Sequence, residues 1–94
     1  MVKAIFNGSI IAESDQVKTV EGKVYFPPGA INRSLFKETD HMTFCDWKGT
    51  AIYYSVTVDG EIAENVSWTY RNPKPEAANI KEFVAFYPIV KIED

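Results

Sequence analysis

The sequence predicts an all-β domain, in which two antiparallel sheets form a compact sandwich with one or two short helical turns. Three observations favour this fold class. Turn-forming residues recur about every 8–12 residues, the spacing of sandwiches and barrels. The segments between them alternate apolar and polar residues, as half-buried strands do. No apolar repeat of helical period continues beyond about two turns. We therefore expect about eight short strands, with less than about a sixth of the residues in helices.

The N-terminal third predicts two hairpins. The four expected strands are Val2–Phe6, Ile10–Glu13, Val17–Glu21 and Lys23–Phe26. Gly8-Ser9 and Gly22 supply the turns, because glycine readily adopts the backbone angles of tight hairpins. Pro27-Pro28 follows the fourth strand and ends it, since proline lacks the N–H group that a strand ladder requires.

The middle of the chain contains its most chemically mixed stretch. We expect a short helical turn over Gly29–Arg33, an extended segment over Ser34–Lys37 and a polar connection over Glu38–Met42. Thr43–Val58 then predicts a strand, a turn and a second strand. In this second strand one face carries Ile52, Tyr54, Val56 and Val58, and the other carries Tyr53, Ser55 and Thr57. The aliphatic face is expected to be buried, leaving the semi-polar aromatic face for another purpose.

The last third contains the clearest hairpin turn, Asp59-Gly60, because both residue types tolerate positive φ. Ala63–Tyr70 is expected to pair back, with Val66, Trp68 and Tyr70 on one face. A brief helix opened by proline is expected over Glu76–Asn79. In Phe83–Ile92 the odd and the even positions are both apolar, apart from one lysine. This pattern predicts a central strand buried on both faces.

Length and composition predict one domain over residues 1–94. A chain of 94 residues with 46% hydrophobic and 14% aromatic residues supplies a single core of ordinary size. Cys45 is the only cysteine, so no internal disulfide is possible. A lone thiol without an apolar leader segment predicts a cytoplasmic location, where thiols remain reduced.

The charge pattern limits the classes of partner. The net charge is −3, and basic residues form no cluster. This pattern predicts neither nucleic acid nor an anionic membrane as a partner. No apolar run approaches the ~18 residues needed to cross a bilayer.

The candidate functional residues gather in Thr43–Val58, which combines a thiol, a cation and aromatic rings. Cys45 is the candidate catalytic nucleophile, a role that requires a nearby cation or helix N-terminus to lower the thiol pKa. A buried cysteine that packs as a small apolar residue is the alternative. Lys48-Gly49 offers an ammonium and a flexible backbone N–H, enough to hold a phosphate or carboxylate. A solvated turn lysine is the alternative for Lys48.

The aromatic residues predict a cleft that holds a small molecule. Tyr53, Trp68 and Tyr70 carry polar groups that need partners, so some of these rings are expected at a cleft edge. Packing in the core is the alternative for any single ring. Trp47 can stack on the neighbouring ammonium. We predict a small-molecule partner, anionic or aromatic, with ligand-binding residues Lys48, Trp47, Tyr53, Trp68 and Tyr70.

The sequence predicts no metal site and no cofactor. Glu38, Asp40, His41 and Asp46 surround Cys45 in the chain, but their spacing matches no zinc pattern. The chain has no phosphate-binding loop of the GxxxxGK[ST] type and no GxGxxG motif after a strand. A Ser-His-Asp arrangement is also missing from the sequence pattern.

A set of residues spread over nearly the whole chain matches a known family. The matching residues are Phe6-Asn7-Gly8, Ile11–Ser14, Tyr25-Phe26-Pro27, Thr43, Cys45, Trp47-Lys48-Gly49, Ala51, Tyr53-Tyr54, Trp68, Tyr70, Pro73, Ile80 and Val84–Pro88. On these residues the chain resembles the small domain-of-unknown-function family numbered four-two-seven, also labelled as nucleotidyltransferase-type. Asp46 departs from the pattern, since the family commonly has proline there.

The resemblance implies a β-tent-like fold, in which two antiparallel sheets are set steeply against each other. Methionine-R-sulfoxide reductases and the thalidomide-binding domain of cereblon are similar in architecture. Many relatives with that architecture join the sheets through a four-cysteine zinc site. A chain with one cysteine would instead rely on aromatic packing, and the fold alone does not supply a function.

The sequence leaves two main functional hypotheses, and a protein-interaction domain that uses a sheet edge is a third one that no particular residue supports. The first is a binding module for a small anionic or aromatic ligand, with Lys48 for charge and the aromatic residues for stacking. The second is an enzyme, either thiol-dependent through Cys45 or nucleotidyl-transferring as the family label suggests. Nucleotidyl transfer requires convergent carboxylates that hold Mg²⁺ and a phosphate-cradling loop. No such motif occurs in the sequence, so we treat the label as inherited naming.

Overall fold

The computed structural model describes residues 1–94 and confirms the all-β class, with about 57% strand and 13% helical residues. The elements in chain order are β1 (Val2–Phe6), β2 (Ser9–Ser14), β3 (Lys18–Val20), β4 (Lys23–Tyr25), η1 (Pro28–Ala30), η2 (Arg33–Leu35), β5 (Phe36–Cys45), β6 (Gly49–Val58), β7 (Glu61–Thr69), η3 (Pro75–Ile80), β8 (Val84–Phe86) and β9 (Lys91–Glu93). The three η elements are short 3-10 helices, and η3 is the brief helix that Pro75 was expected to open.

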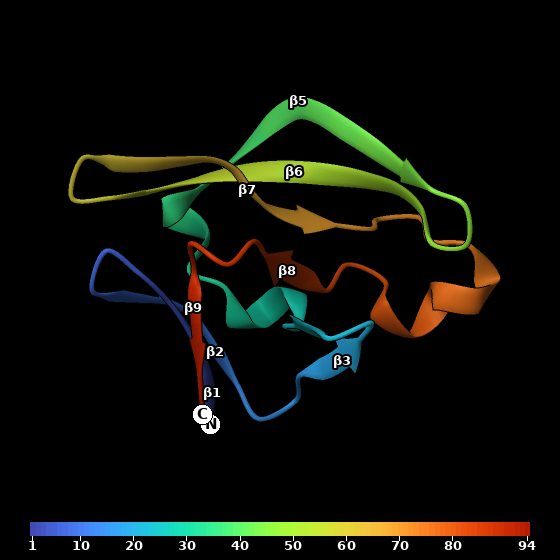
Figure 1. Cartoon of the computed structure of the whole chain (residues 1–94), viewed down its shortest axis with the longest axis horizontal. Coiled ribbons are helices and arrows are strands. Elements are labelled where there is room, and N and C mark those ends of the chain that lie inside the picture. The colour runs from blue at the N-terminus through green and yellow to red at the C-terminus, as the bar shows by residue number, and fades with distance from the viewer.

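The strands form three antiparallel sheets where two were expected. A four-stranded sheet, in the order β5-β6-β7-β8, lies over a three-stranded sheet, in the order β2-β1-β9 (Figure 1). The third sheet is the two-stranded β3–β4 ribbon. Its separation follows from Pro27 and Pro28, which end the ladder directly after β4. Phe26, directly after β4, joins the ribbon to the backbone of the large sheet through two hydrogen bonds of 2.8 Å with Val84.

The ends of the chain lie side by side at the bottom of the molecule (Figure 1). The reason is the pairing of β1 with β9. The N-terminal nitrogen of Met1 lies 3.7 Å from the carboxylate of Asp94. The three-stranded sheet is therefore complete only with the last strand of the chain, β9.

The predicted hairpin turns are confirmed by their backbone angles. Asp59 and Gly60 have φ values of 49° and 82°, and they connect β6 to β7. Gly22 has a φ of 77° in the β3–β4 turn. The first turn lies one residue earlier than expected, at Asn7-Gly8, because Ser9 already belongs to β2.

The segment Glu38–Met42 is part of a strand and not a polar connection, so that prediction is wrong. It lies in β5, the edge strand of the large sheet. The side chains of β5 are all exposed or half-buried, because this strand has a neighbour on only one side and no layer above it. A strand in this position needs no apolar alternation, which is why its sequence looked like a loop.

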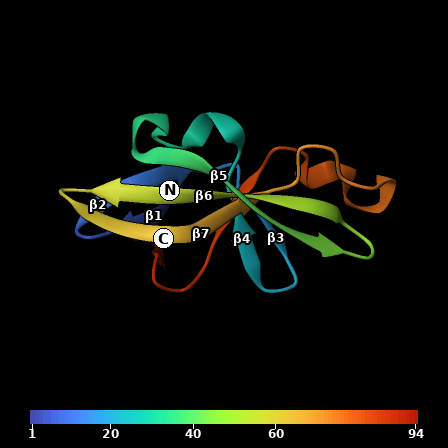
Figure 2. The same ribbon diagram turned by 90° about the horizontal axis from the view of Figure 1, so that it is seen from above.

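The large sheet bends sharply near its middle. The β5–β6 ladder shifts register between Glu38 and Met42, and the β6–β7 ladder shifts between Tyr54 and Val56. Asn65 on β7 has a positive φ of 50° within this second irregularity. Bulges increase the local twist of a sheet. Figure 2 looks down on the sheet and shows its strands crossing near the centre.

Two groups of buried side chains form the core. The first contains Ala4, Phe6, Ile11, Ala12, Phe26, Ile31, Val56, Val58, Ala63, Val66, Val84, Phe86 and Val90. The second contains Tyr25, Ala51, Tyr53, Trp68, Tyr70, Ala77, Ile80 and Ala85. Strand β8 contributes to both, because its successive side chains point to opposite faces.

The structure modifies three expectations about which faces are buried. Val56 and Val58 lie in the first core group, as expected for the aliphatic face of β6, but Tyr53 on the opposite face is also only 4% exposed. Val66 and Trp68 are both buried yet belong to different groups, with the irregularity at Asn65 just before them. The expected central strand Phe83–Ile92 is two strands in two sheets, of which only β8 is buried on both faces.

Candidate functional site

The turn between β5 and β6 carries the predicted Cys45, Trp47 and Lys48. Two hydrogen bonds from Lys74 hold this turn: its backbone N–H donates to the carbonyl of Lys48 at 2.9 Å, and its Nζ donates to the carbonyl of Asp46 at 2.6 Å. Asp46 stands where the family that the sequence resembles commonly has proline, but the turn is held in place without that proline. The neighbouring chain supplies the rigidity instead.

The side chain of Lys48 is buried and already has an anionic partner. Lys48 is 8% exposed, and its ammonium forms an ion pair with the carboxylate of Glu21 in the β3–β4 turn. The Nζ atom lies 5.0 Å from the ring centre of Trp47 and 5.9 Å from that of Tyr70. Glu21 was not among the predicted site residues, because it lies 27 positions from Lys48 in the chain. In the structure it has a positive φ of 53° and lies in the β3–β4 turn.

The ion pair shifts both pKa values toward the charged forms. The hydrogen bond from Lys48 holds the pKa of the Glu21 carboxyl below its ordinary value of 4.5. Burial acts to lower the pKa of Lys48, but the hydrogen bond to Glu21, followed by nearby anionic groups, leaves that pKa raised above 10.5. Burial also raises the pKa of Tyr70. The side chain of Lys48 is therefore charged at neutral pH.

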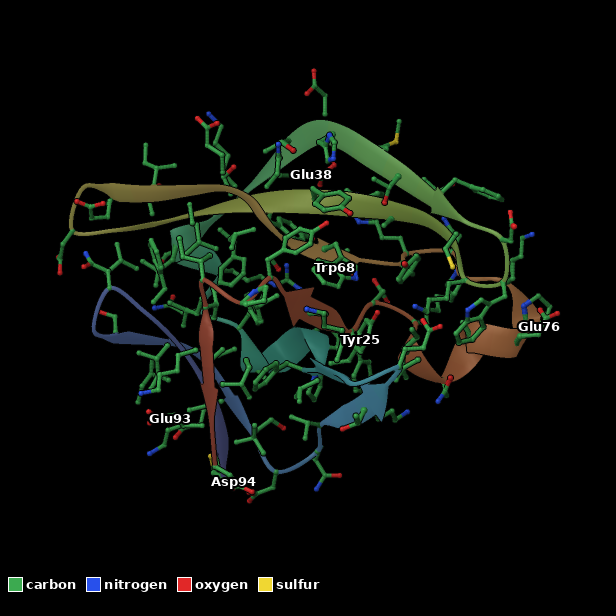
Figure 3. The ribbon with its side chains drawn as sticks, in the orientation of Figure 1. Tyr25, Glu38, Trp68, Glu76, Glu93 and Asp94 are labelled. Atoms are coloured by element: carbon green, nitrogen blue, oxygen red, sulfur yellow. The ribbon has the colours of Figure 1, made fainter.

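Trp68 is the centre of an aromatic cluster under the large sheet. Figure 3 shows it beneath β6 and β7 with Tyr25 below it. Its indole N–H donates to the hydroxyl of Tyr25 at 3.3 Å. The ring centres of Tyr53 and Tyr87 lie 6.2 Å and 4.7 Å from that of Trp68. Three of these rings are buried, whereas Tyr87 is 44% exposed and packs against Tyr53 and Trp68.

Polar groups at the edge of this cluster are also connected. The hydroxyl of Tyr53 lies 3.0 Å from the hydroxyl of Thr43 and 3.3 Å from that of Tyr87. The hydrogen bond with Tyr53 raises the pKa of Tyr87. The ammonium of Lys23 lies 5.8 Å from the ring centre of Trp68 and 5.9 Å from that of Tyr87. Lys23 was not among the predicted site residues, since nothing local distinguishes it from other turn lysines.

Cys45 is half-buried at the end of β5, against the second core group. His41 does not approach it as a base; its ring packs edge-on against Tyr53, with ring centres 4.6 Å apart. The structure thus brings Trp47, Tyr70 and Glu21 together around the ammonium of Lys48. It places Tyr53 and Trp68 in the aromatic cluster, which is adjacent through Tyr25, Tyr70 and the rest of the second core group.

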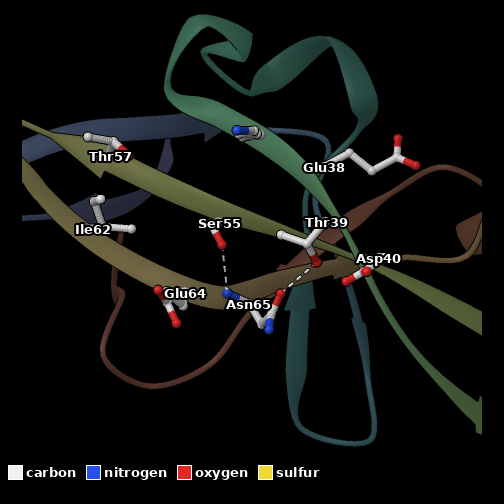
Figure 4. Close-up of a pocket in the computed structure, with 9 residues that line it drawn as sticks. Glu38, Thr39, Asp40, Ser55, Thr57, Ile62, Glu64 and Asn65 are labelled. Carbon is white, nitrogen blue, oxygen red and sulfur yellow. Dashed lines mark hydrogen bonds between the residues drawn. The ribbon is translucent and has the colours of Figure 1, made fainter.

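The chain has four surface cavities, and none of them is lined by the ligand-binding residues predicted from the sequence. The acidic cavity, about 420 Å³, lies over the bend of the large sheet and is lined by Lys37, Glu38, Thr39, Asp40, Ser55, Thr57, Ile62, Glu64 and Asn65. Figure 4 shows Asn65 at its centre, bonded to Ser55 and Thr39. Only one of its nine lining residues, Ile62, is hydrophobic, whereas sites for small organic molecules have mostly hydrophobic linings.

A second cavity lies between the β3–β4 ribbon and β9. We name it the ribbon cavity; its volume is about 370 Å³, and it is lined by Gly22, Lys23, Val24, Phe86, Pro88, Val90, Lys91 and Ile92. Half of its lining residues are hydrophobic. The same Lys23 lies beside Trp68 and Tyr87, so the cavity borders the exposed edge of the aromatic cluster.

Comparison with known proteins identifies the family. The model of a domain of unknown function, DUF427, labelled NTP_transf_9, matches residues 1–93. The chain belongs to this family. The resemblance seen in the sequence is thereby confirmed over nearly the full length of the chain. No curated protein gives a significant match.

The nucleotidyltransferase label of the DUF427 family finds no support in the arrangement of carboxylates. No group of three or more His, Cys, Asp or Glu side chains is placed to hold a metal ion, although Glu38, Asp40 and Glu64 all line the acidic cavity. Nucleotidyl transfer would require such convergence.

No helix is long and apolar enough to cross a membrane.

Proposed function

We propose that this DUF427 domain binds a small organic anion with an apolar or aromatic body in the ribbon cavity. The observation that carries the proposal is the combination of an apolar wall with two lysines, Lys23 and Lys91, in one cavity of about 370 Å³. Ligand pockets of about 300–1,000 Å³ with mostly apolar walls and a few polar groups are typical of small-molecule sites. This assignment keeps the ligand class that the sequence predicted and adds Lys23 to its cations.

The two lysines suit an anion because neither is buried in a strong ion pair. Lys23 makes only cation–π contacts. Lys91 pairs with Glu93 at 3.0 Å, but the Lys91 side chain is 72% exposed, and exposed pairs of this kind contribute little. The apolar part of the ligand would cover Val24, Phe86 and the neighbouring side chains of the wall.

Lys48 supports the same cavity from a distance. Its partner Glu21 directly precedes Gly22 and Lys23, which form the cavity rim. The Lys48–Glu21 pair therefore fixes the tip of the β3–β4 ribbon against the β5–β6 turn. The role predicted for Lys48 in the sequence, direct contact with the ligand anion, would require the ligand to replace Glu21. The two roles differ in what the loss of Lys48 does to binding.

The test is a thermal-shift panel with benzoate, hexanoate, adenosine monophosphate and glucose 6-phosphate. The proteins are the natural chain, Lys23→Met, Lys48→Met and the control Lys81→Met, which removes an exposed lysine outside the cavity. At 100-fold saturation a bound ligand adds about 2.7 kcal/mol to the free energy of unfolding. We expect stabilisation of the natural chain and the control, and loss of stabilisation in Lys23→Met.

Lys48→Met separates the two roles of Lys48. A partial loss of ligand stabilisation supports positioning of the ribbon through Glu21, whereas a complete loss with Lys23→Met unaffected moves the site to Lys48, as the sequence predicted. Equal stabilisation of all four proteins would refute a lysine-dependent site. A panel that stabilises none of them would refute the proposed ligand class.

A further inference from the structure

A third cavity lies where η2 meets β6, β7 and β8, and its volume is about 160 Å³. We name it the arginine cavity; its lining residues are Arg33, Tyr54, Thr69, Arg71, Glu82 and Val84. It shares no residue with the ribbon cavity and contains none of the residues that the sequence predicted for a site. Any ligand here is therefore independent of the function proposed above.

The two arginines of the chain meet in this cavity, but they are held differently. The guanidinium of Arg71 forms an ion pair with Glu38 and donates to the hydroxyl of Tyr54 at 3.3 Å, which fixes its orientation. The guanidinium of Arg33 donates one hydrogen bond, to the carbonyl of Pro28 at 3.3 Å, and forms no ion pair. Since a guanidinium has five N–H donors, most of those of Arg33 are unused by the protein.

The wall of the arginine cavity also contains a polar group without a partner. Thr69 is 2% exposed, and its hydroxyl has no hydrogen-bond partner. Buried hydroxyls are nearly always bonded, so an orphan in a cavity wall is a feature that calls for an explanation. This oxygen is closed off from solvent, so the groups of the cavity that can bond a ligand are those of Arg33, Arg71 and Glu82.

The charges of the wall define the chemistry of the ligand. Arg33 and Arg71 are cationic, and Glu82 contributes one carboxylate that has no ion-pair partner. A complementary ligand needs an anionic group for the guanidiniums and a hydrogen-bond donor for Glu82. Guanidinium binds carboxylate and phosphate through paired hydrogen bonds. A dianionic phosphate would be repelled by the carboxylate of Glu82. A ligand with one carboxylate and a separate hydrogen-bond donor instead suits both the guanidiniums and Glu82.

The volume limits the ligand to a few heavy atoms, because a water molecule occupies about 30 Å³ of liquid. We propose that the arginine cavity binds a small carboxylic acid that carries a hydroxyl or an ammonium group, the pattern of a free hydroxy acid or α-amino acid. The carboxylate lies between Arg33 and Arg71. The hydroxyl or ammonium group donates to Glu82.

The experiment is a titration followed by the amide and arginine side-chain signals of the ¹⁵N-labelled protein. The probes are glycolate, glycine, acetate and inorganic phosphate. The proteins are the natural chain, Arg33→Gln and the control Lys81→Gln, which removes a neighbouring exposed charge outside the cavity wall. Arg33 is exposed and makes only one long hydrogen bond, so its replacement leaves the fold intact, which the spectrum itself verifies.

Glycolate or glycine should shift the signals of Arg33, Thr69 and Arg71 in a saturable way. Arg33→Gln should weaken this binding by about tenfold or more, the scale of one charge-assisted hydrogen bond, and Lys81→Gln should not change it. Acetate should bind more weakly, because it offers Glu82 no donor. The proposal is overturned if neither glycolate nor glycine saturates, if phosphate binds more tightly than both, or if Arg33→Gln binds as well as the natural chain.

Discussion

Trp68 and Thr69 are sequence neighbours on β7 with opposite energetic roles. Trp68 contacts three other rings and bonds to Tyr25, whereas the buried hydroxyl of Thr69 bonds to nothing. Burial alone therefore does not measure how much a residue stabilises the fold. What decides is whether each buried polar group has a partner.

We expect Trp68→Ala to lower the free energy of unfolding by at least about 3 kcal/mol, the scale for deletion of a buried aromatic side chain. Thr69→Val keeps the shape and removes the unpartnered hydroxyl, so it should change stability by less than about 1 kcal/mol or raise it. Denaturant melts of both variants measure the contrast. A loss below about 1 kcal/mol for Trp68→Ala would place the indole outside the core.

Cys45 allows a direct test of the enzymatic alternative. Its thiol is half-buried, and His41 packs on Tyr53 instead of approaching it. A catalytic thiol is reactive because its pKa is lowered by a nearby cation or base. We expect Cys45 to react with iodoacetamide near neutral pH no faster than an ordinary thiol in a short peptide. Alkylation much faster than the peptide control would instead favour a thiol-dependent enzyme.

At the scale of elements, the Lys48–Glu21 pair joins the β3–β4 ribbon to the β5–β6 turn. The Lys48 side chain is 10% exposed and that of Glu21 is 58% exposed, so the two ends of the pair are not equivalent. Without Lys48, Glu21 is left in water. Without Glu21, the ammonium of Lys48 is left buried and unpaired, which is costly. Glu21→Gln should therefore destabilise the protein more than Lys48→Met does at neutral pH.

The same pair predicts a pH dependence. The pKa of Glu21 is lower in the folded state, so its contribution to stability is complete above its ordinary pKa of 4.5 and is lost as the pH falls through the lowered value. The pKa of Lys48 is raised, so its contribution is complete below 10.5 and is lost at higher pH. Thermal melts on an acid series should show the natural chain converging with Glu21→Gln below about pH 4.5. A difference between the two proteins that persists in acid would contradict this account.

The bend of the large sheet depends on Asn65. Its φ of 50° is positive, its backbone N–H donates to Ser55 at 3.0 Å, and its side-chain oxygen accepts from Thr39 at 2.6 Å. Asn65→Val places a branched side chain in a left-handed conformation and removes the bond to Thr39, at a cost of about 2 kcal/mol or more. Asn65→Gly loses only the side-chain bond and should cost less than half as much, since glycine adopts positive φ freely. Equilibrium unfolding of the two variants distinguishes backbone strain from the lost hydrogen bond.

At the scale of the whole molecule, the two core groups share strand β8. Val84 and Phe86 belong to the first group, and Ala85 belongs to the second. Neither group can be exposed without breaking this strand, so we expect the molecule to unfold in one step as a single domain. Melts followed by far-ultraviolet circular dichroism and by tryptophan fluorescence in Trp47→Phe, which leaves only Trp68, should coincide. Two separate transitions would divide the chain into independent units.

The sequence by itself determined the local parts of this protein and its family. Turns such as Asp59-Gly60 were predictable because positive φ is tolerated by few residue types. Strand β4 ends where expected, because proline lacks the N–H group that a strand ladder requires, whatever the rest of the fold. Of the rings that contact Trp68, only Tyr53 was among the predicted site residues, because Tyr25 and Tyr87 come from other parts of the chain.

Only the tertiary structure decided which groups meet across the chain. The partner of Lys48 is Glu21, Trp68 packs against Tyr87, and β5 is an edge strand with a polar sequence. These outcomes depend on strand register and on the bulges in β5 and β7, which no local preference encodes. The cavities follow from the same long-range packing. A register shift changes which side chains face one another, so the candidate site emerges only when the sheets are assembled.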